Sequence, residues 1–270
     1  MGISDETLAQ IAEEVFDALG TPREVSLYTG RFPGYCLEDA YRVVEDIRIR
    51  RQARGERVVG RKIGFTNSAA WAGYGISGPI WNYLYDVTTL DLDVSHVYPL
   101  RGSPNVRMET EIALGLCAVP QPAMDDDQLL RCVDWVALDF EICTSIFPDW
   151  RFEVADAAAT GVHVALVLGE RHSIGPDRTF WAESLGSFSA TLSESEGAHA
   201  VGGGAQVLGS PIKAFGYLVR EIARFGGQPL RSGDIVTTGT LTKALPATCG
   251  QCWQARVEGI PLAGLEIRLG

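Results

Sequence analysis

Hydrophobic positions along this chain follow two periods, and each period predicts one kind of element. A spacing of three and four residues predicts an amphipathic helix over residues 4–19, with Ser4 as a suitable N-cap and Gly20 after the last apolar position. The same spacing predicts further helices over residues 37–54, 125–133 and 210–225. Alternation and short apolar runs predict strands over residues 58–66, 86–119, 136–143, 162–168, 188–192, 235–238, 252–257 and 265–269. Helices come first and strands dominate the rest, an order typical of an α+β fold.

Two glycine-rich segments lie between the predicted elements. Residues 71–85 combine glycine with aromatic side chains, which is typical of a pocket rim or a packed turn region. The run 202–204 consists of three glycines outside any phosphate-loop context, so we interpret it as a tight turn. The sequence also lacks GxSxG, P-loop and HExxH motifs, which argues against a serine hydrolase, a P-loop protein and a zinc hydrolase.

The strand around residue 110 carries two carboxylates on one face. Glu109 and Glu111 alternate with Met108, Thr110 and other residues that point to the opposite side. Burying two like charges is costly unless a cation lies between them. The later apolar run 136–143 contains an embedded glutamate, Glu141.

Three carboxylates are a ligand set that suits Mg²⁺ or Mn²⁺ and leaves coordination positions for water and substrate. An exposed strand face with alternating charge explains Glu109 and Glu111 almost as well, and the embedded Glu141 favours the metal site. Lys62 has two interpretations as well. Near a metal it would stabilise an enolate or move protons, whereas on an edge strand it would discourage aggregation.

Composition narrows the function classes further. The chain has 270 residues, 46% of them hydrophobic, a net charge of -11 and an isoelectric point near 4.9. No basic run is present, which disfavours nucleic-acid binding. The acidic N-terminus is unlike a signal peptide, and no apolar run is long enough to predict a membrane span. The six cysteines are spread through mostly apolar surroundings, so we expect a protein of a reducing compartment, the cytoplasm.

Several motifs match one known family in both order and spacing. The matching segments are 60–64 (GRKIG), 109–113 (ETEIA), 134–135 (DW) followed by Glu141, 207–211 (VLGSP) and 233–239 (GDIVTTG). With these motifs the chain resembles the 2-keto-4-pentenoate hydratase and 4-oxalocrotonate decarboxylase family, a branch of the fumarylacetoacetate hydrolase superfamily. The resemblance runs from the helix around residue 40 to the C-terminus.

The resemblance implies a fold and a set of site residues. A small N-terminal helical or α/β region, residues 1–75, would pack on a mixed β-roll of the fumarylacetoacetate hydrolase C-terminal-domain type, residues 76–270. Glu109, Glu111 and Glu141 fall on the family's metal ligands, and Lys62 falls on its active-site lysine. A homo-oligomer is also expected, because members of the family are often oligomeric.

We therefore expect a Mg²⁺- or Mn²⁺-dependent lyase, a hydratase, acting on a small anionic 2-oxo or 2-hydroxydienoic acid. Decarboxylation is the alternative, because Ile80 stands where hydratases of this group usually have Asp and Thr240 fits the decarboxylase pattern better. Asp86 and Lys243 are weaker candidates for substrate contacts. A C–C hydrolase, a tautomerase or a non-catalytic binding protein are further alternatives.

One further departure from the family's pattern concerns the expected substrate. Ala157-Ala158-Ala159-Thr160 replaces a polar stretch of the relatives. We therefore expect fewer polar contacts to a standard substrate and a bulkier or more apolar substrate.

Overall fold

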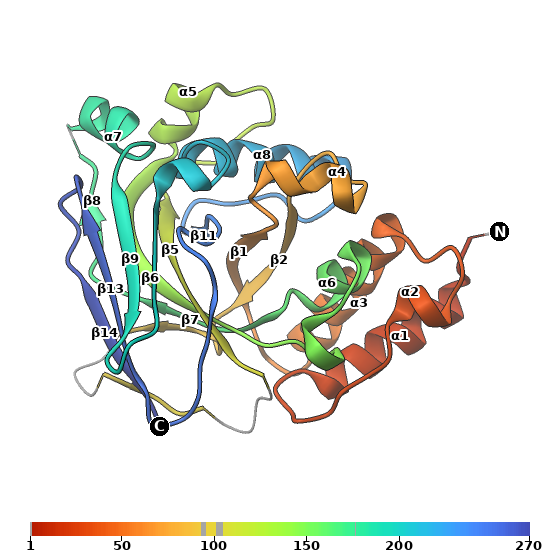
Figure 1. Cartoon of the computed structure of the whole chain (residues 1–270). Coiled ribbons are helices and arrows are strands. Elements are labelled where there is room, and N and C mark those ends of the chain that lie inside the picture. The colour runs from red at the N-terminus through yellow and green to blue at the C-terminus, as the bar shows by residue number, and fades with distance from the viewer. Residues whose placement is uncertain (1, 93–95, 101–104, 176) are drawn as a thin grey trace.

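Two β-sheets form the framework of the computed structural model, which describes residues 2–92, 96–100, 105–175 and 177–270 (Figure 1). Among the described residues the larger sheet has nine strands. Its main path runs through β2 (Ile80–Tyr85), β1 (Val58–Gly64), β11 (Ile235–Thr237), β5 (Arg107–Leu116), β6 (Val133–Cys143), β7 (His163–Leu168) and β3 (Thr89–Asp91). Two short strands pair with this path, β12 (Leu245–Pro246) with β5 and β8 (His172–Ser173) with β6.

The smaller sheet lies beside the larger one and is built mainly from the C-terminal part of the chain (Figure 1). Its order is β10 (His199–Gly203), β9 (Ser189–Glu194), β13 (Cys252–Glu258), β14 (Leu265–Leu269) and β4 (Val97–Tyr98). Both sheets contain parallel and antiparallel pairs, because β1 pairs in parallel with β11 and β14 pairs in parallel with β4. The fold is therefore a mixed α+β fold, as the sequence predicted.

Four helices form a layer at one side of the larger sheet (Figure 1). They are α1 (Asp5–Ala18), α2 (Tyr28–Arg31), α3 (Leu37–Ala53) and α6 (Val154–Thr160). Apolar residues of these helices, such as Ile11, Val43 and Ala158, are buried in one shared cluster. The predicted helix start at Ser4 is confirmed, because the Ser4 hydroxyl accepts a hydrogen bond from the amide of Thr7 at 3.2 Å.

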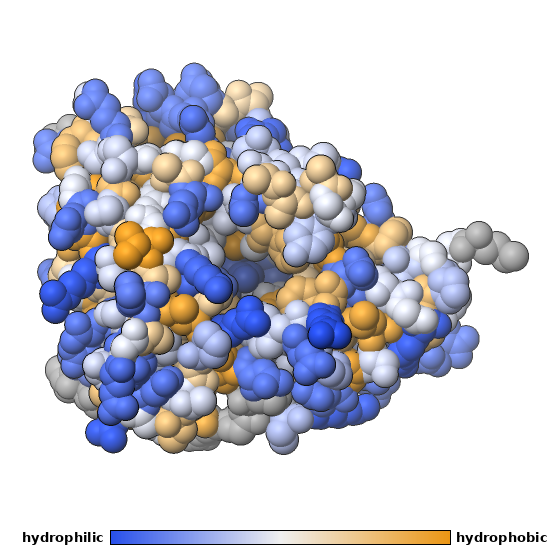
Figure 2. Space-filling model, in the orientation of Figure 1, coloured by the Kyte–Doolittle hydropathy of each residue, from blue (hydrophilic) through white to orange (hydrophobic). Residues whose placement is uncertain are grey.

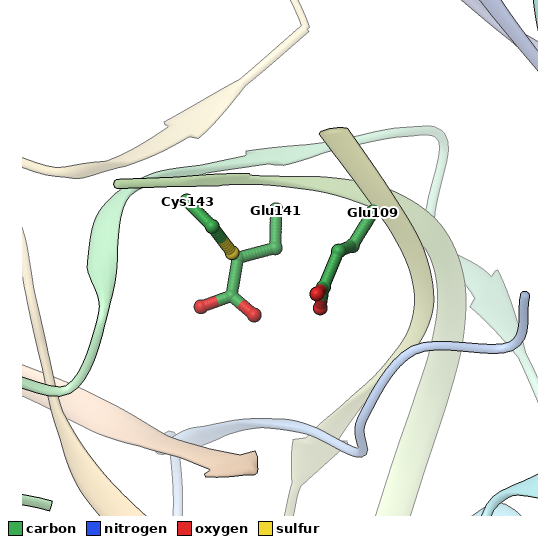
Figure 3. Close-up of side chains that lie close together, drawn as sticks. All are labelled: Glu109, Glu141 and Cys143. Carbon is green, nitrogen blue, oxygen red and sulfur yellow. The ribbon is translucent and has the colours of Figure 1, made fainter. Parts of the chain in front are cut away.

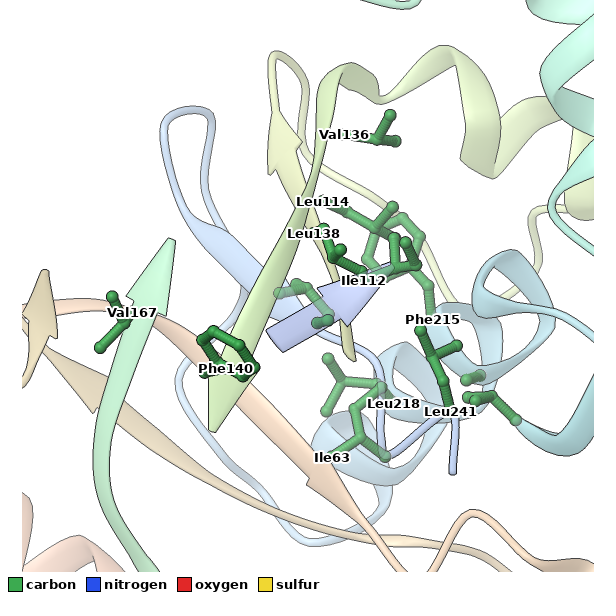
Figure 4. Packing of buried hydrophobic residues seen from close by; sticks show 14 of the residues in the cluster. Ile63, Ile112, Leu114, Val136, Leu138, Phe140, Val167, Phe215, Leu218 and Leu241 are labelled. Carbon is green, nitrogen blue, oxygen red and sulfur yellow. The ribbon is translucent and has the colours of Figure 1, made fainter. Parts of the chain in front are cut away.

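The remaining helices lie across the top of the molecule in the view of Figure 1. They are α4 (Trp71–Tyr74), α5 (Asp126–Arg131), α7 (Arg178–Ser184) and α8 (Pro211–Arg224), and short 3-10 turns occur at Ser68–Ala70, Pro148–Trp150 and Gly204–Gln206. Helix α8 packs Phe215 and Leu218 into the same apolar cluster as Ile112 and Leu138 of the sheet (Figure 4). None of the helices in the described ranges is long and apolar enough to cross a membrane.

The two faces of the β5–β6 hairpin differ in character because successive side chains point to opposite sides of a strand. The outer face carries large apolar residues such as Ile112 and Phe140 (Figure 4). The inner face begins with the small cluster around Ala113 and Ala137 and continues with carboxylates. This difference places the polar residues of the hairpin together on one side of the sheet.

The structure changes two predictions of local structure and adds helices that the sequence did not predict. Residues 71–85 form helix α4 and strand β2 instead of a turn region, although Tyr74 and Ile80 of this segment line a cavity, in keeping with the predicted pocket rim. Gly202 and Gly203 lie in strand β10 and Gly204 begins a 3-10 turn, so the three glycines do not form the predicted tight turn. A Cβ on Gly202 would lie 1.9 Å from the carbonyl oxygen of Leu241, so the glycine permits a close backbone approach. Helices α2, α4, α6 and α7 were not predicted.

The predicted β-structure over residues 86–119 includes 93–95 and 101–104, which lie outside the described residues. The elements on either side of the predicted domain boundary at residue 75 do not separate into two groups in the structure. Strand β1 precedes it but belongs to the large sheet, and helix α6 follows it but packs with the N-terminal helices. The division into two domains stays a prediction.

A buried carboxylate joins two helices of the helical layer, α2 and α6. Asp156 on α6 is fully buried and accepts hydrogen bonds from the amides of Tyr28 at 2.8 Å and Thr29 at 3.2 Å. Its other oxygen accepts from the Thr29 hydroxyl at 2.6 Å and from the amide of Glu153 at 3.2 Å. Asp156 therefore satisfies free amides at the start of α2 and of α6 together.

We expect Asp156→Ala to lower the free energy of unfolding by about 2–4 kcal/mol, because buried donors would lose a charged acceptor. Urea unfolding followed by circular dichroism would measure the change. Glu183→Ala, at an exposed position on α7, is the matched control and should remain within about 0.5 kcal/mol of the wild type. Equal stability of both variants would show that the Asp156 hydrogen bonds contribute no net stability.

Candidate metal and catalytic site

A cavity of about 950 Å³ opens between the larger sheet and the helical layer. Figure 2 shows that the molecule is hollowed on this side, with hydrophilic residues around the recess. Its walls come from segments far apart in the sequence, including β1, the turn before α6 and the segment after β11. Polar lining residues include Lys62, Glu109, Arg107, Arg151, Thr240 and Lys243.

The inner face of the β5–β6 hairpin brings four carboxylates together. Antiparallel pairing sets Glu109 opposite Glu141 and Glu111 opposite Asp139. Glu111, Asp139 and Glu141 are fully buried, whereas Glu109 lines the cavity and is partly exposed. On this face, Ala113 and Ala137 lie farther from the cavity, and the carboxylates follow them along both strands towards it. Figure 3 shows Glu109 and Glu141 projecting from neighbouring strands into the same space, together with Cys143.

Lys62 supplies a cation to this group. Its Nζ lies 3.0 Å from Oε1 of Glu141, and both side chains are buried. The same carboxylate oxygen is 2.7 Å from Nδ1 of His163, the first residue of β7. Strand β1 reaches the hairpin only through β11, so the sheet order is what brings Lys62 to Glu141.

Glu111 is held by the segment that contains and follows β11. Its Oε2 accepts hydrogen bonds from the Thr237 hydroxyl and, at 2.7 Å, from the amide of Gly239. The Thr237 hydroxyl is also 3.4 Å from Oδ2 of Asp139. Because a hydroxyl has one hydrogen, Thr237 can donate to only one of the two carboxyl groups, and a proton on the other would complete the pair.

Burial and mutual repulsion divide the four carboxyl groups by pKa. Burial and the charge of Glu141 raise the pKa of Glu109 to about 7 and raise the pKa values of Glu111 and Asp139 well above their usual range. Burial also opposes ionisation of Glu141, but Lys62 and His163 lower its pKa to about 2. Glu141 is therefore the ionised partner of Lys62, whose pKa it raises despite burial.

The residues present fit a divalent cation. In the described part of the chain, Oε1 of Glu111, Oδ1 of Asp139 and Oε2 of Glu141 are buried without a hydrogen-bond partner. An unsatisfied carboxylate oxygen inside a protein is costly, and a hard cation is a partner that satisfies several at once. Lys62 forms its ion pair with Glu141, so ionising the other three carboxyl groups as well would require further positive charge, which a divalent ion supplies.

The predicted metal ligands are brought into one cluster, with one difference from the predicted set. Atoms of Glu109, Glu141 and Cys143 lie within 4.8 Å of one another, whereas Glu111 is not in that tightest group. Its Oε2 is instead held by Thr237 and Gly239, while Oε1 has no partner among the described residues.

Three of the four weaker candidates line the cavity. Ile80, Thr240 and Lys243 belong to its lining. Asp86 does not, because it binds the backbone amide and the side chain of Arg57, each at 2.9 Å. The expected substrate contact of Asp86 is therefore not supported by its position at the far end of β2.

The stretch 157–160 also lies away from the cavity lining. Ala157, Ala158 and Ala159 are buried in the apolar cluster of the helical layer. Thr160 donates its hydroxyl to the carbonyl oxygen of Ala157 at 3.2 Å. This departure from the family's pattern therefore changes helix packing and does not remove polar groups from the cavity wall.

Sequence reasoning missed three members of the cluster. Asp139 and Cys143 each lie two residues from Glu141, so the alternation that placed Glu109 and Glu111 on one face could have identified them. His163 had no local signal, because its contact with Glu141 depends on the pairing of β6 with β7.

Comparison with known proteins relates this geometry to a family, although no family model matches the chain. A 2-keto-4-pentenoate hydratase from Paraburkholderia phymatum is 31% identical over 215 residues, which cover 78% of each protein. The chain belongs to the 2-keto-4-pentenoate hydratase and 4-oxalocrotonate decarboxylase family. Another relative in this family, a 4-oxalocrotonate decarboxylase from Pseudomonas sp. strain CF600, is 27% identical over 263 residues, which cover 95% of this chain and 94% of the relative.

A solved structure shares the fold of this family member over its whole length. The 4-oxalocrotonate decarboxylase from Pseudomonas putida G7, complexed with magnesium and adipate, has a TM-score of 0.88 and 24% identity, with 99% of each chain covered. A putative fumarylacetoacetate isomerase/hydrolase from Oleispira antarctica and a fumarylpyruvate hydrolase from Pseudomonas aeruginosa also share the fold, with TM-scores of 0.58 and 0.56. The expected type of mixed β-roll is thus confirmed.

We expect Mg²⁺ or Mn²⁺ to raise the thermal stability of the metal-free protein, by about 2.7 kcal/mol at a concentration 100 times the dissociation constant. At about pH 8, where a carboxyl group with a pKa of about 7 is mostly ionised, Glu109→Gln should stabilise the metal-free protein by removing repulsion. The same variant should reduce the rise caused by the ion. Differential scanning calorimetry with and without ion measures both effects.

Asp86→Asn is the matched control, because Asp86 is paired with Arg57 outside the cavity lining. It should keep the full rise caused by the ion. If Glu109→Gln also kept the full rise, Glu109 would not be a ligand.

Proposed function

We propose that this protein is a divalent-metal-dependent lyase, a hydratase, that acts on a small 2-oxo or 2-hydroxydienoic acid. The observation that carries the proposal is the buried carboxylate cluster with Lys62 at the floor of a large cavity. Membership in a family whose named proteins are hydratases and decarboxylases supports the same class of reaction.

Glu109, Glu111 and Glu141 would hold the metal, and Mg²⁺ or Mn²⁺ suits their oxygen donors. When bound, the ion would draw electron density towards the carboxylate and 2-oxo oxygens of the substrate. The hydrogen bonds from Thr237 and Gly239 orient Glu111, and the ring of His163 orients Glu141. Such outer contacts restrict the rotation of ligand side chains.

Lys62 is the residue that we propose for catalysis. Glu141 keeps its Nζ charged inside the protein, so the ammonium group can donate a hydrogen bond to a developing enolate oxygen. Nζ can also hold or deliver a proton while the substrate changes between its enol and keto forms. In hydration, C5 would be protonated and water would add at C4.

Cations on the cavity wall suit an anionic substrate in spite of the acidic protein. The cations Arg107, Arg151 and Lys243 line the cavity together with the uncharged Thr240. Local cations reverse the field of the net charge of -11 within one cleft. We propose that Thr240 and Lys243 contact the substrate.

Decarboxylation is a second candidate because of Ile80. This residue lines the cavity, and a Cβ on Gly64 would lie 3.3 Å from its Cγ1 and 3.8 Å from Nζ of Lys62. An apolar side chain therefore flanks the same glycine as the proposed catalytic lysine, where the resemblance gives hydratases an Asp. An isoleucine cannot activate water, and decarboxylation adds none.

Time-resolved NMR separates the two reactions. The Mg²⁺-loaded protein would be mixed with 2-hydroxypenta-2,4-dienoate and, separately, with 2-oxohex-3-enedioate, with Glu109→Ala as the control. A hydroxylated C4 without loss of carbon supports the hydratase, and release of CO₂ supports the decarboxylase. If both substrates remain unchanged with metal-loaded protein, the proposed function is wrong.

We expect Lys62→Met to lower kcat by about 10²–10⁴-fold, the usual contribution of a positioned proton donor. Metal affinity should not fall, because the substitution removes a cation that competes for Glu141. Steady-state kinetics and calorimetric Mn²⁺ titration measure the two quantities. Lys213→Met, at an exposed position on α8, is the matched control and should leave both unchanged.

If Lys62→Met instead lowered metal affinity and left kcat unchanged at saturating metal, Lys62 would help to form the metal site and would not take part in catalysis. The expected homo-oligomer and the expected cytoplasmic location stay predictions.

A further inference from the structure

Cys143 occupies a position in the cluster that the proposed reaction does not use. It is the last residue of β6, and the alternation of the strand puts it on the same face as Glu141. Register places it opposite Arg107 on β5, two residue pairs beyond Glu109 and Glu141. The side chain is buried and also lines the cavity, so an ion that enters the cavity passes beside the sulfur.

The sulfur is close enough to the carboxylates to share an ion with them. Sγ of Cys143 and carboxylate oxygens of Glu109 and Glu141 all lie within 4.8 Å of one another. Two donors that bind one ion at about 2.0–2.3 Å each can be up to about 4.6 Å apart. Figure 3 shows the three side chains directed into one space. Small side-chain rotations are therefore sufficient for one ion to contact all three.

A second observation points to a ligand at this place. Oε2 of Glu141 is completely buried and has no hydrogen-bond partner among the residues that the structure describes. The other oxygen of Glu141 already contacts Lys62 and His163. The cluster therefore contains an unsatisfied acceptor next to the thiol, which a cation would satisfy.

We propose that Cys143 is an additional donor that gives this metal site a preference for thiophilic divalent ions such as Zn²⁺, Co²⁺ and Cd²⁺. The inference rests on the metal site of the proposed function and concerns which ions that site accepts. Thiolate sulfur selects softer ions, whereas carboxylate oxygen alone suits Mg²⁺ and Mn²⁺. When the metal–sulfur bond forms, the thiol proton leaves to water, and no oxidant or reductant takes part.

The proposal makes the thiol a determinant of metal choice. Mg²⁺ would bind through the carboxylates and water and leave the thiol protonated. A softer ion would contact sulfur as well and bind more tightly. The protein would thus exchange its metal when a thiophilic ion is abundant.

Cobalt titration of the metal-free full-length protein tests the proposal directly. Absorption spectra would be recorded for the wild type, Cys143→Ser and Cys132→Ser. Cys132 is the matched control, because it is also buried but contacts Gln128 and Met124 at the end of α5. Bound Co²⁺ gives weak visible bands with any ligands, and a strong near-ultraviolet charge-transfer band only with a thiolate ligand.

We expect the charge-transfer band in the wild type and in Cys132→Ser, and its loss in Cys143→Ser. Competition titrations should show Cd²⁺ affinity falling at least about tenfold in Cys143→Ser, since even the loss of outer-shell contacts costs roughly 10–100-fold. Mg²⁺ affinity should stay the same in all three proteins.

The possible failures are distinguishable. Saturable Co²⁺ binding without the charge-transfer band in the wild type would overturn the role of Cys143 and leave the carboxylate site intact. A band that persists in Cys143→Ser would assign sulfur ligation to another cysteine and also overturn the proposal. If the wild type binds neither Co²⁺ nor Mn²⁺, the metal site and the proposed function fail together.

Discussion

The structure depends on the repulsion among four carboxyl groups placed on one face of two paired strands. Glu109, Glu111, Asp139 and Glu141 cannot all be ionised in a buried hairpin without compensating charge. The protein supplies part of that charge through Lys62, which contacts only Glu141 within ion-pair distance in the described residues. The remaining imbalance favours a further positive charge beside this hairpin, as the proposed metal site requires.

Sheet order and close backbone contact bring the compensating groups to the hairpin. Strand β11 lies between β1 and β5, so one short strand delivers Thr237 to Glu111 and positions Lys62 beyond it. Gly60 allows this approach, because a Cβ there would lie 1.8 Å from the carbonyl oxygen of Ile235. Asp156 fixes the opposite wall, since it joins α2 to α6 beside the segment that lines the cavity.

Site residues could be predicted from the sequence where they follow a local pattern, but not where their contact depends on how distant strands pair. Alternation alone put Glu109 and Glu111 on one face, and it contained the same information for Asp139. Sequence reasoning made Lys62 a candidate and the family resemblance supported it, but its position beside Glu141 requires two strand pairings separated in sequence. His163 depends on a third pairing, and the ion pair of Asp86 with Arg57, outside the cavity lining, cannot be recognised from spacing either.

The same alternation has a consequence for how the chain folds. A shift of the β5–β6 pairing by one residue moves every side chain to the other face of the sheet. Glu109 and Glu111 would then enter the apolar cluster under α8, and Ile112 would face the cavity. Burying these carboxylates among apolar side chains costs far more free energy than the same one-residue shift would cost in a uniformly apolar hairpin. The carboxylates that we assign to the metal thus also fix the register of the hairpin, because they disfavour the shifted pairing before any ion binds.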